Sequence, residues 1–350
     1  MTENYTINRD FATQVLSWYD QNARDLPWRV GPEAREKGVR PDPYFVWLSE
    51  IMLQQTTIPH ATRYFLEFTR RWPDVFALAA AERDEIMAAW AGLGYYSRAR
   101  NLYACAQIVA DKGGFPETAA ELIRLPGIGP YTSGAIAAIA FDEQAAAVDG
   151  NVERVMSRYL AIEQPLREIK PRLRQAVEGI VPLHRPGDFA QAMMDLGATV
   201  CTPRSPSCDA CPLHGGCKAF ELGDVTKFPV KSKAPAKPRR EGTAFIHIEN
   251  GELTLERRPD TGLLAGMVGL PTTEWITLDQ SAKADSPSSV GQNTGFVEHV
   301  FTHFHLTLHV NVVESIVSEH PVRVPIKAWD KTGLPSVFQK AVRLYLKHQH

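Results

Sequence analysis

The chain has 350 residues, of which 44% are hydrophobic and 22% charged, and its formal net charge is −2. This length predicts two or three domains, and this composition is typical of a soluble globular protein rather than a disordered or membrane-spanning one. The near-neutral charge excludes binding to nucleic acid through overall positive charge, so phosphate contacts must come from local patches and backbone groups.

The N-terminal two thirds of the chain is predicted to be helical. Its first ten residues, MTENYTINRD, lack the basic start and apolar core of a secretory signal, which favours a cytoplasmic location with no membrane partner. Over residues 7–220, apolar residues recur at helical spacing in short segments bounded mostly by Pro, Gly or Asp, as in FATQVLSWYDQNA. No alternating strand pattern interrupts these segments. We therefore expect an all-α domain over residues 8–220.

Two carboxyl groups in this part of the chain stand out by their surroundings. Glu50 lies in the apolar and amide-rich stretch WLSEIMLQQT, where burial would raise its pKa until it holds a proton at neutral pH. A solvated surface carboxylate is the alternative for this residue. Asp149, in AAVDGNVERV, stands at a predicted helix start, where capping is the common role of Asp. Two acids in different environments form the general arrangement for cleaving a glycosidic bond.

The stretch LPGIGPYTSGAI, residues 125–136, predicts a tight turn between two helices. Gly127 and Gly129 would let the backbone approach a phosphate closely, and the following helix would offer its positive end to the same anion. Tyr131 follows the turn, where a simple phosphate site would carry a lysine or an arginine. The turn comes about 20 residues before Asp149, which strengthens the prediction of a nucleic-acid site.

Four of the five cysteines lie within 17 residues, in CTPRSPSCDACPLHGGC. Cys201, Cys208, Cys211 and Cys217 have the spacing C-x6-C-x2-C-x5-C, so their thiolates are expected to converge on one small centre. The remaining cysteine, Cys105, stands alone in a helical pattern and is expected to be buried. The spacing fits both a structural zinc ion and an iron–sulfur cluster, and it does not distinguish between them.

Residues 221–241 change in composition. The stretch VTKFPVKSKAPAKPRR holds six basic residues, three prolines and no acid, which predicts an interdomain linker. A solvated tether is the simpler interpretation of this charge, and a tether that also touches DNA phosphates is the alternative.

After residue 241 the apolar period becomes two, which predicts a small α+β domain over residues 242–348. TAFIHIENGELTLERRP predicts a hairpin around Asn250–Gly251, and DQSAKADSPSSVGQNTG predicts a polar loop. FTHFHLTLHVNVV alternates, and SVFQKAVRLYL predicts an amphipathic helix. The apolar residues expected on one face of the alternating strand are Phe304, Leu306, Leu308 and Val310. If the strand were continuous, His299, His303, His305 and His309 could share one face. A metal site on these histidines is therefore the alternative interpretation.

Several of these motifs occur in an order that resembles a known family. LPGIGPYTSGAI, VDGNV and the four-cysteine loop resemble the endonuclease III superfamily of helix-hairpin-helix DNA glycosylases. PWR (27–29), SEIMLQQT (49–56) and GLGYYSRARNL (92–102) resemble its adenine-specific branch. The resemblance implies a [4Fe–4S] cluster on the four cysteines. It also implies a monofunctional enzyme that excises adenine mispaired with 8-oxoguanine or guanine from duplex DNA, acting as a monomer at the bacterial nucleoid.

The resemblance further implies roles for the matched residues. Glu50 would protonate adenine at N7, and Asp149 would stabilise the sugar cation electrostatically or as a transient covalent partner. Tyr131 and Asn151 would support this centre, with Tyr131 hydrogen-bonded to Asp149. The residues implied for the adenine pocket are Trp28, Arg29 and Asp195. The residues implied for DNA binding are Gln54, Gln55, Tyr95, Gly127 and Gly129.

Gln55 and Tyr95 match a wedge that fills the space vacated by a flipped base. Asp195, in MMDLG, stands where the family usually has Glu, so we expect this shorter acid to reach the adenine edge through a water molecule.

LERRPDTGLLAGMVGLP resembles the Nudix-like domain of the same family, with Val268 where Trp is usual. The metal-binding glutamates of a Nudix box are missing from the sequence, so we expect a recognition role rather than pyrophosphatase activity. FTH, residues 301–303, matches a loop that recognises 8-oxoguanine through Phe301, Thr302 and His303, with Thr302 where Ser is common. This loop would break the strand on which a histidine metal site depends.

Two other functions fit the sequence less well. A pyrimidine glycosylase with strand-cleaving activity needs an amine nucleophile to form a Schiff base, and Tyr131 stands where strand-cleaving relatives carry lysine. A damage-binding protein without enzymatic activity would have no use for both Glu50 and Asp149.

Overall fold

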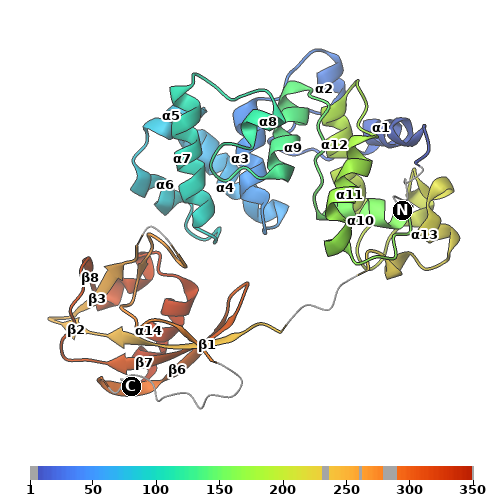
Figure 1. Ribbon diagram of the computed structural model, residues 1–350. Coiled ribbons are helices and arrows are strands. Elements are labelled where there is room, and N and C mark those ends of the chain that lie inside the picture. The colour runs from blue at the N-terminus through green and yellow to red at the C-terminus, as the bar shows by residue number, and fades with distance from the viewer. Residues whose placement is uncertain (1–6, 231–235, 260–261, 279–289, 349–350) are drawn as a thin grey trace. The chain divides into compact units, whose positions relative to one another are not determined.

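The computed structural model describes residues 7–230, 236–259, 262–278 and 290–348. The chain divides into two compact units, Met1–Lys233 and Ala234–His350. The first unit is built of helices, and the second is built of strands with one long helix (Figure 1). Within the described ranges, no helix has the length and apolar character needed to cross a membrane.

The helices of the first unit follow one another through short connections. In chain order they are α1 (Phe11–Asn22), α2 (Pro32–Glu36), α3 (Pro43–Leu53), α4 (Ile58–Arg71), α5 (Val75–Ala80), α6 (Arg83–Ala89), α7 (Ser97–Asp111), α8 (Ala119–Leu122), α9 (Pro130–Phe141), α10 (Gly150–Tyr159), α11 (Leu166–Glu178), α12 (Pro186–Asp195), the π-helical turn η1 (Leu196–Val200), η2 (Cys208–Ala210), η3 (His214–Gly216), α13 (Lys218–Glu221) and η4 (Val225–Lys227). Residues 7–230 contain no strand, as the sequence predicted.

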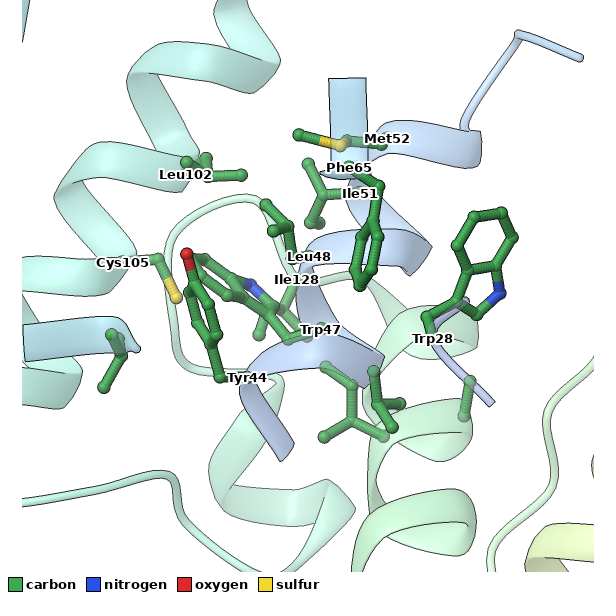
Figure 2. Packing of buried hydrophobic residues seen from close by; sticks show 14 of the residues in the cluster. Trp28, Tyr44, Trp47, Leu48, Ile51, Met52, Phe65, Leu102, Cys105 and Ile128 are labelled. Carbon is green, nitrogen blue, oxygen red and sulfur yellow. The ribbon is translucent and has the colours of Figure 1, made fainter. Parts of the chain in front are cut away.

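Two hydrophobic cores hold the helical unit together. The first surrounds α3, where Trp47 is fully buried and Figure 2 shows it packed among other large side chains, including Tyr44 and Ile128. Cys105 is buried in this core, as predicted. The second core joins α1, α10, α11 and α12 to the loop that carries the four clustered cysteines. Burial of this apolar surface provides the main driving force for folding of the helical unit.

The predicted turn between two helices is present between α8 and α9. Leu125 and Ile128 are buried and fix the turn to the first core, while Gly127 has φ of 76°. This left-handed conformation favours glycine, and a Cβ here would also lie 2.8 Å from the Cβ of Asn101. Gly129 is the N-cap of α9 and has an ordinary extended backbone.

The second unit contains two four-stranded sheets. Its elements are β1 (Arg239–Ile246), β2 (Ile248–Glu249), β3 (Glu252–Arg257), β4 (Val268–Gly269), β5 (Ile276–Thr277), β6 (Gln292–Val300), β7 (His305–Val312), β8 (Pro321–Pro325), η5 (Ile326–Lys331) and α14 (Ser336–His348). One sheet has the order β5-β1-β7-β6, with β1 and β7 parallel; the other has the order β2-β3-β4, with β8 also paired to β3. The α+β prediction is confirmed.

Local predictions in this unit are confirmed where the structure describes them. Asn250 and Gly251 both have positive φ and connect β2 to β3 in a hairpin. The alternating residues Phe304, Leu306, Leu308 and Val310 are all buried. The loop 301–304 separates β6 from β7, so the histidines do not share one continuous strand. The predicted polar loop lies largely in 279–289, outside the described residues.

The observed boundaries of the linker differ from the predicted range 221–241. Phe228 is only 1% exposed, and its carbonyl oxygen accepts a hydrogen bond of 3.0 Å from Nε of Arg158, so this end belongs to the helical unit. At the other end, β1 begins at Arg239 and pairs with β7. The composition of this segment predicted that its basic residues are solvated. It gave no sign that the side chain of Phe228 is buried at one end, or that strand pairing begins at Arg239 at the other end.

Candidate active site

A cavity of about 330 Å³ in the helical unit is lined from α3, α9, α10, α12 and the segment before α2. Its size falls in the range of small-ligand sites. The residues of the sequence prediction that line it are Trp28, Arg29, Glu50, Gln54, Tyr131, Asp149 and Asn151. The fold therefore brings these side chains together from positions up to 123 residues apart in the sequence (28 to 151).

Glu50 is on α3 and is only 8% exposed, so the surface alternative is wrong. Burial raises the pKa of its carboxyl to about 7. A hydrogen bond with Tyr131 opposes this rise, the negative charge of Asp149 adds to it, and the positive charge of Arg29 opposes it. A substantial fraction of Glu50 is therefore protonated at neutral pH and able to donate a proton.

Asp149 is the N-cap of α10, and three N–H groups donate to its carboxylate. Its Oδ1 accepts from the backbone N–H of Asn151 at 2.9 Å and of Val152 at 2.8 Å, and Oδ2 accepts from the side-chain amide of Asn151 at 2.7 Å. Hydrogen bonds to an ionised acceptor are stronger than neutral ones, and the helix N-terminus adds a positive dipole end. The capping role and a role in the cavity are thus combined in one carboxylate.

Tyr131 lies in the first turn of α9, and its position corrects one expectation. Its hydroxyl donates to Sδ of Met194 at 3.6 Å and lies close enough to the carboxyl of Glu50 to lower the pKa of that group. Among the described residues, the donors to the carboxylate of Asp149 are Asn151 and Val152, and Tyr131 faces Glu50 instead because α3 packs directly on α9. Burial raises the pKa of Tyr131 well above its usual value, so the phenol stays neutral and can donate.

Asp195 does not line the cavity, contrary to the expectation that it contacts a bound base through water. It is fully buried behind the cavity wall. Its Oδ1 accepts from Nε of Arg24 at 2.7 Å, and its Oδ2 accepts from Nη1 of Arg29 at 2.8 Å. Burial acts to raise the pKa of Asp195, but the bonds and charges of Arg29 and Arg24 lower it below its usual value. Asp195 therefore orients two arginines that face the cavity.

Replacing Asp195 by Ala should destabilise the protein by about 3–5 kcal/mol, because it leaves two partly desolvated guanidinium groups without their counter-ion. Urea unfolding followed by circular dichroism measures this change. Glu67→Ala is the matched control, since Glu67 pairs with Arg70 and Arg71 on the exposed face of α4, where loss of an ion pair changes little. Equal stability of the Asp195→Ala variant and the control would refute the proposed importance of the buried pair.

The four clustered cysteines line a second cavity between α10 and the loop 200–225. Within the ranges that the structure describes, no three Cys, His, Asp or Glu side chains are placed to hold a single metal ion. Buried Arg158 donates to Sγ of Cys201 at 3.2 Å and to the carbonyl oxygen of Thr202 at 2.8 Å, and a positive charge of this kind suits an anionic thiolate cluster.

The remaining predicted residues lie outside the main cavity. Gln55 and Tyr95 are exposed, and both have left-handed backbones, with φ of 58° and 49°. Gly127 and Gly129 are in the turn before α9. In the second unit, Phe301 stacks on Phe304 with ring centroids 4.8 Å apart, while Thr302 and His303 are exposed in the loop between β6 and β7.

Arg24 and Gln191 are among the cavity residues that the sequence interpretation did not predict. Arg24 lines the cavity through its pairing with Asp195, which is 171 residues away and leaves no local signal. Gln191 is 2% exposed and lines the cavity, and its Nε2 has no hydrogen-bond partner within the described part of the chain. An amide in the otherwise apolar stretch DFAQAMM could have indicated this second residue.

Three family models match the chain, and their matches follow the same order along the sequence as the helical unit, the cysteine loop and the second unit. Residues 48–178 match the HhH-GPD superfamily of base excision DNA repair proteins. Residues 201–217 match the iron–sulfur binding domain of endonuclease III, and residues 243–344 match the NUDIX domain. The cofactor is therefore a [4Fe–4S] cluster, which Cys201, Cys208, Cys211 and Cys217 would hold, so that it would tie together the two ends of the loop 201–217.

Comparison with known proteins identifies the family. An adenine DNA glycosylase of Buchnera aphidicola (from Acyrthosiphon pisum) is 39% identical, over 97% of this chain and 98% of its own. Adenine DNA glycosylases of rat and Arabidopsis thaliana are 34% and 38% identical, and this chain spans 78% and 51% of their lengths. A solved thermostable thymine-DNA glycosylase superposes on 61% of this chain and 97% of its own, with a TM-score of 0.54 and 30% identity. The chain thus belongs to the adenine DNA glycosylase family of the endonuclease III superfamily and is a base excision repair enzyme that binds duplex DNA.

Proposed function

We propose that the chain hydrolyses the N-glycosidic bond of adenine mispaired with 8-oxoguanine or guanine, without efficient strand cleavage. The observation that carries this proposal is the pair of carboxyl groups in one cavity with different environments. Glu50 is buried, with a pKa raised to about 7, while Asp149 accepts three hydrogen bonds at a helix N-terminus. One group is suited to give a proton, and the other to face a positive charge.

The reaction follows from these two environments. Duplex binding extrudes the adenine into the cavity, and the carboxyl of Glu50 donates a proton to N7 of the base. The electrons of the glycosidic bond then pass to the base, which leaves as neutral adenine, and the sugar becomes an oxocarbenium ion. The carboxylate of Asp149 stabilises this cation, and water adds to C1′. The proton released by that water restores the acid form of Glu50 through solvent.

Other residues would position the substrate. Trp28 and Arg29 would grip the flipped base, Asn151 would orient Asp149, and Tyr131 would hold the carboxyl of Glu50. The turns that carry Gln55 and Tyr95 would fill the vacated stack, with Gln54 and the glycine turn at 127–129 contacting the strand. The loop of Phe301, Thr302 and His303 would recognise 8-oxoguanine. We further propose that the enzyme acts as a monomer in the cytoplasm, where its DNA substrate lies in a bacterial cell.

A second candidate, a thymine glycosylase, is favoured by the likeness to the solved thymine-DNA glycosylase. Among the residues that the structure describes, those lining the cavity include no lysine that could attack the sugar as an amine. A panel of duplexes containing A:8-oxoguanine, A:G and T:G, each assayed with and without alkali, separates the candidates. We expect adenine release from the first two and strand breaks only after alkali. Release of thymine, or of no base, would refute the proposal.

Adenine release should depend on pH through Glu50. Because its protonated form is the active one and its pKa is about 7, the single-turnover rate is expected to fall tenfold per pH unit well above pH 7. The rate should reach a plateau as the pH decreases below 7, until carboxylates with normal pKa values begin to titrate. A pH profile of the single-turnover rate between pH 5 and 9 measures both the fall above pH 7 and the plateau below it. A rate that stays flat from pH 6 to 9 would show that no acid of this pKa takes part.

Replacing Tyr131 by Lys should add strand-cleaving activity, because the amine would lie beside the buried acid in the same cavity. Borohydride trapping of a covalent protein–DNA adduct on an A:8-oxoguanine duplex measures the Schiff base. Tyr131→Phe is the control, since it removes the hydroxyl without supplying an amine. If the lysine variant gives no more adduct than the phenylalanine variant, the geometry assigned to this position is wrong.

A further inference from the structure

We propose that Arg98 is a positioning residue, which fixes two DNA-contacting turns in the conformation needed to extrude adenine from the duplex. This inference rests on the function proposed above. Arg98 is in the first turn of α7 and lies outside the cavity wall. The proposed role depends on the two backbone segments that its guanidinium group connects.

The guanidinium of Arg98 donates hydrogen bonds to two separate segments. Nη1 lies 2.9 Å from the carbonyl oxygen of Ile51 and 3.2 Å from that of Met52, both in the last turn of α3. Nη2 lies 3.0 Å from the carbonyl oxygen of Leu93 and 3.2 Å from that of Gly94. Carbonyl groups in the last turn of a helix lack intrahelical partners, and a cation there also opposes the negative dipole end. One planar group thus connects the end of α3 to the loop before α7.

Aromatic rings hold the same guanidinium from its faces. Its central carbon lies 5.3 Å from the ring centroid of Trp90 and 5.6 Å from that of Tyr95. Trp90 is fully buried and donates its indole N–H to the carbonyl oxygen of Gly94 at 3.0 Å. Arg98 is therefore fixed in orientation, since its fork meets carbonyl oxygens and its plane meets a buried ring.

Each joined segment leads directly into a strained, exposed residue. Gln55 follows Met52 by three positions and has φ of 58°, while Tyr95 follows Gly94 and has φ of 49°. A left-handed backbone is unfavourable for a non-glycine residue, so the surroundings must impose it. Both residues are exposed, and the contact described above for the ring of Tyr95 is made to Arg98 itself. Arg98 contacts the backbone just before each of them, which makes it the group best placed to impose both conformations.

The expected consequence concerns base extrusion rather than bond cleavage. Unstacking and unpairing a base costs free energy, and residues that are already positioned to enter the stack lower this cost. Lysine in place of Arg98 keeps the charge, but it cannot reach two pairs of carbonyl oxygens at once or stack as a plane. Arg98→Lys should therefore leave Glu50 and Asp149 in place while loosening the two turns.

The test compares two duplexes under single-turnover conditions. In one, adenine is stacked opposite 8-oxoguanine; in the other, adenine lies opposite an abasic-site analogue and is already partly unstacked. Arg98→Lys should slow adenine release about tenfold or more on the stacked duplex, and within about threefold of wild type on the unstacked one, because less extrusion energy is needed there. Arg174→Lys is the surface control, since Arg174 pairs with Glu178 along α11 and lies outside the cavity wall.

Glu50→Gln serves as the comparison for a defect in chemistry, which should be equally large on both duplexes. Fluorescence of 2-aminopurine placed beside the adenine reports unstacking directly, and its rise on binding should be smaller for Arg98→Lys than for wild type. An equal rate penalty on both duplexes, or no penalty on either, would overturn the assignment of Arg98. The rate of the wild-type enzyme is measured in the same experiment. If the proposed function were wrong, the wild-type enzyme itself would release no adenine, and this result is distinct from a wrong assignment of Arg98.

Discussion

Glu50→Gln is expected to abolish adenine release while leaving duplex binding intact. The carboxyl of Glu50 is buried, and its raised pKa of about 7 means that its neutral form is readily populated. Glutamine has the same shape and is also neutral, so the hydrogen bond with Tyr131 and the packing of α3 on α9 can persist. What is lost is a proton that can be transferred, which is worth about 10²–10⁴ in rate for a general acid.

Single-turnover release from an A:8-oxoguanine duplex, with affinity measured separately, gives both quantities. We expect the rate to fall at least about 100-fold, with the dissociation constant changed by less than about threefold. Glu178→Gln is the matched control, because that carboxylate is exposed at the end of α11 and lies outside the cavity wall. Retention of most of the activity by Glu50→Gln would refute its assignment as the acid.

Asp149→Asn is expected to reduce the rate by a similar or larger factor with little change in stability. The asparagine oxygen can still accept from the backbone N–H groups of Asn151 and Val152, so α10 keeps its cap. The negative charge that faces the sugar cation is removed, and loss of one such electrostatic partner costs about 10²–10³ in rate. The side chain of Asn151 must also turn, because its amide now meets a second amide donor in place of Oδ2.

Asp149→Ala separates the two roles of this residue. It removes the charge and the cap together, so the free energy of unfolding should fall by about 0.5–2 kcal/mol in addition to the loss of rate. Thermal unfolding of both variants, together with single-turnover rates, provides the comparison. If Asn preserved both rate and stability, Asp149 would be a cap only, and the stabilisation of the sugar cation would have to come from another group.

The sequence predicted those features whose physical causes are local. The positive φ of Gly127, the hairpin at Asn250–Gly251 and the buried alternation of β7 each follow from a few adjacent residues. Capping of α10 by Asp149 could likewise be predicted from the sequence, because an Asp that precedes a helical pattern accepts hydrogen bonds from the free backbone N–H groups of the first turn. The resemblance to a known family then gave roles to several residues that local patterns alone would have left as caps or surface acids.

Features that depend on how helices pack could not be predicted in this way. The partner of Tyr131 is Glu50 rather than Asp149, because α3 lies against α9. Asp195 supports Arg24 and Arg29 from behind the cavity, an arrangement set by residues that are 171 and 166 positions apart. The linker begins later than predicted for the same kind of reason, since Phe228 is buried and its carbonyl oxygen accepts a hydrogen bond from Arg158 of α10.

The measurement that tests the central claim most directly uses a duplex in which the target is 7-deazaadenine opposite 8-oxoguanine. This base keeps the pairing edge of adenine but has carbon in place of N7, so a buried acid has no ring nitrogen to protonate at that position. If Glu50 drives the reaction by donating a proton to N7, the unaltered enzyme should bind this duplex with normal affinity and release no base. Release of 7-deazaadenine at a rate near that of adenine would contradict the account.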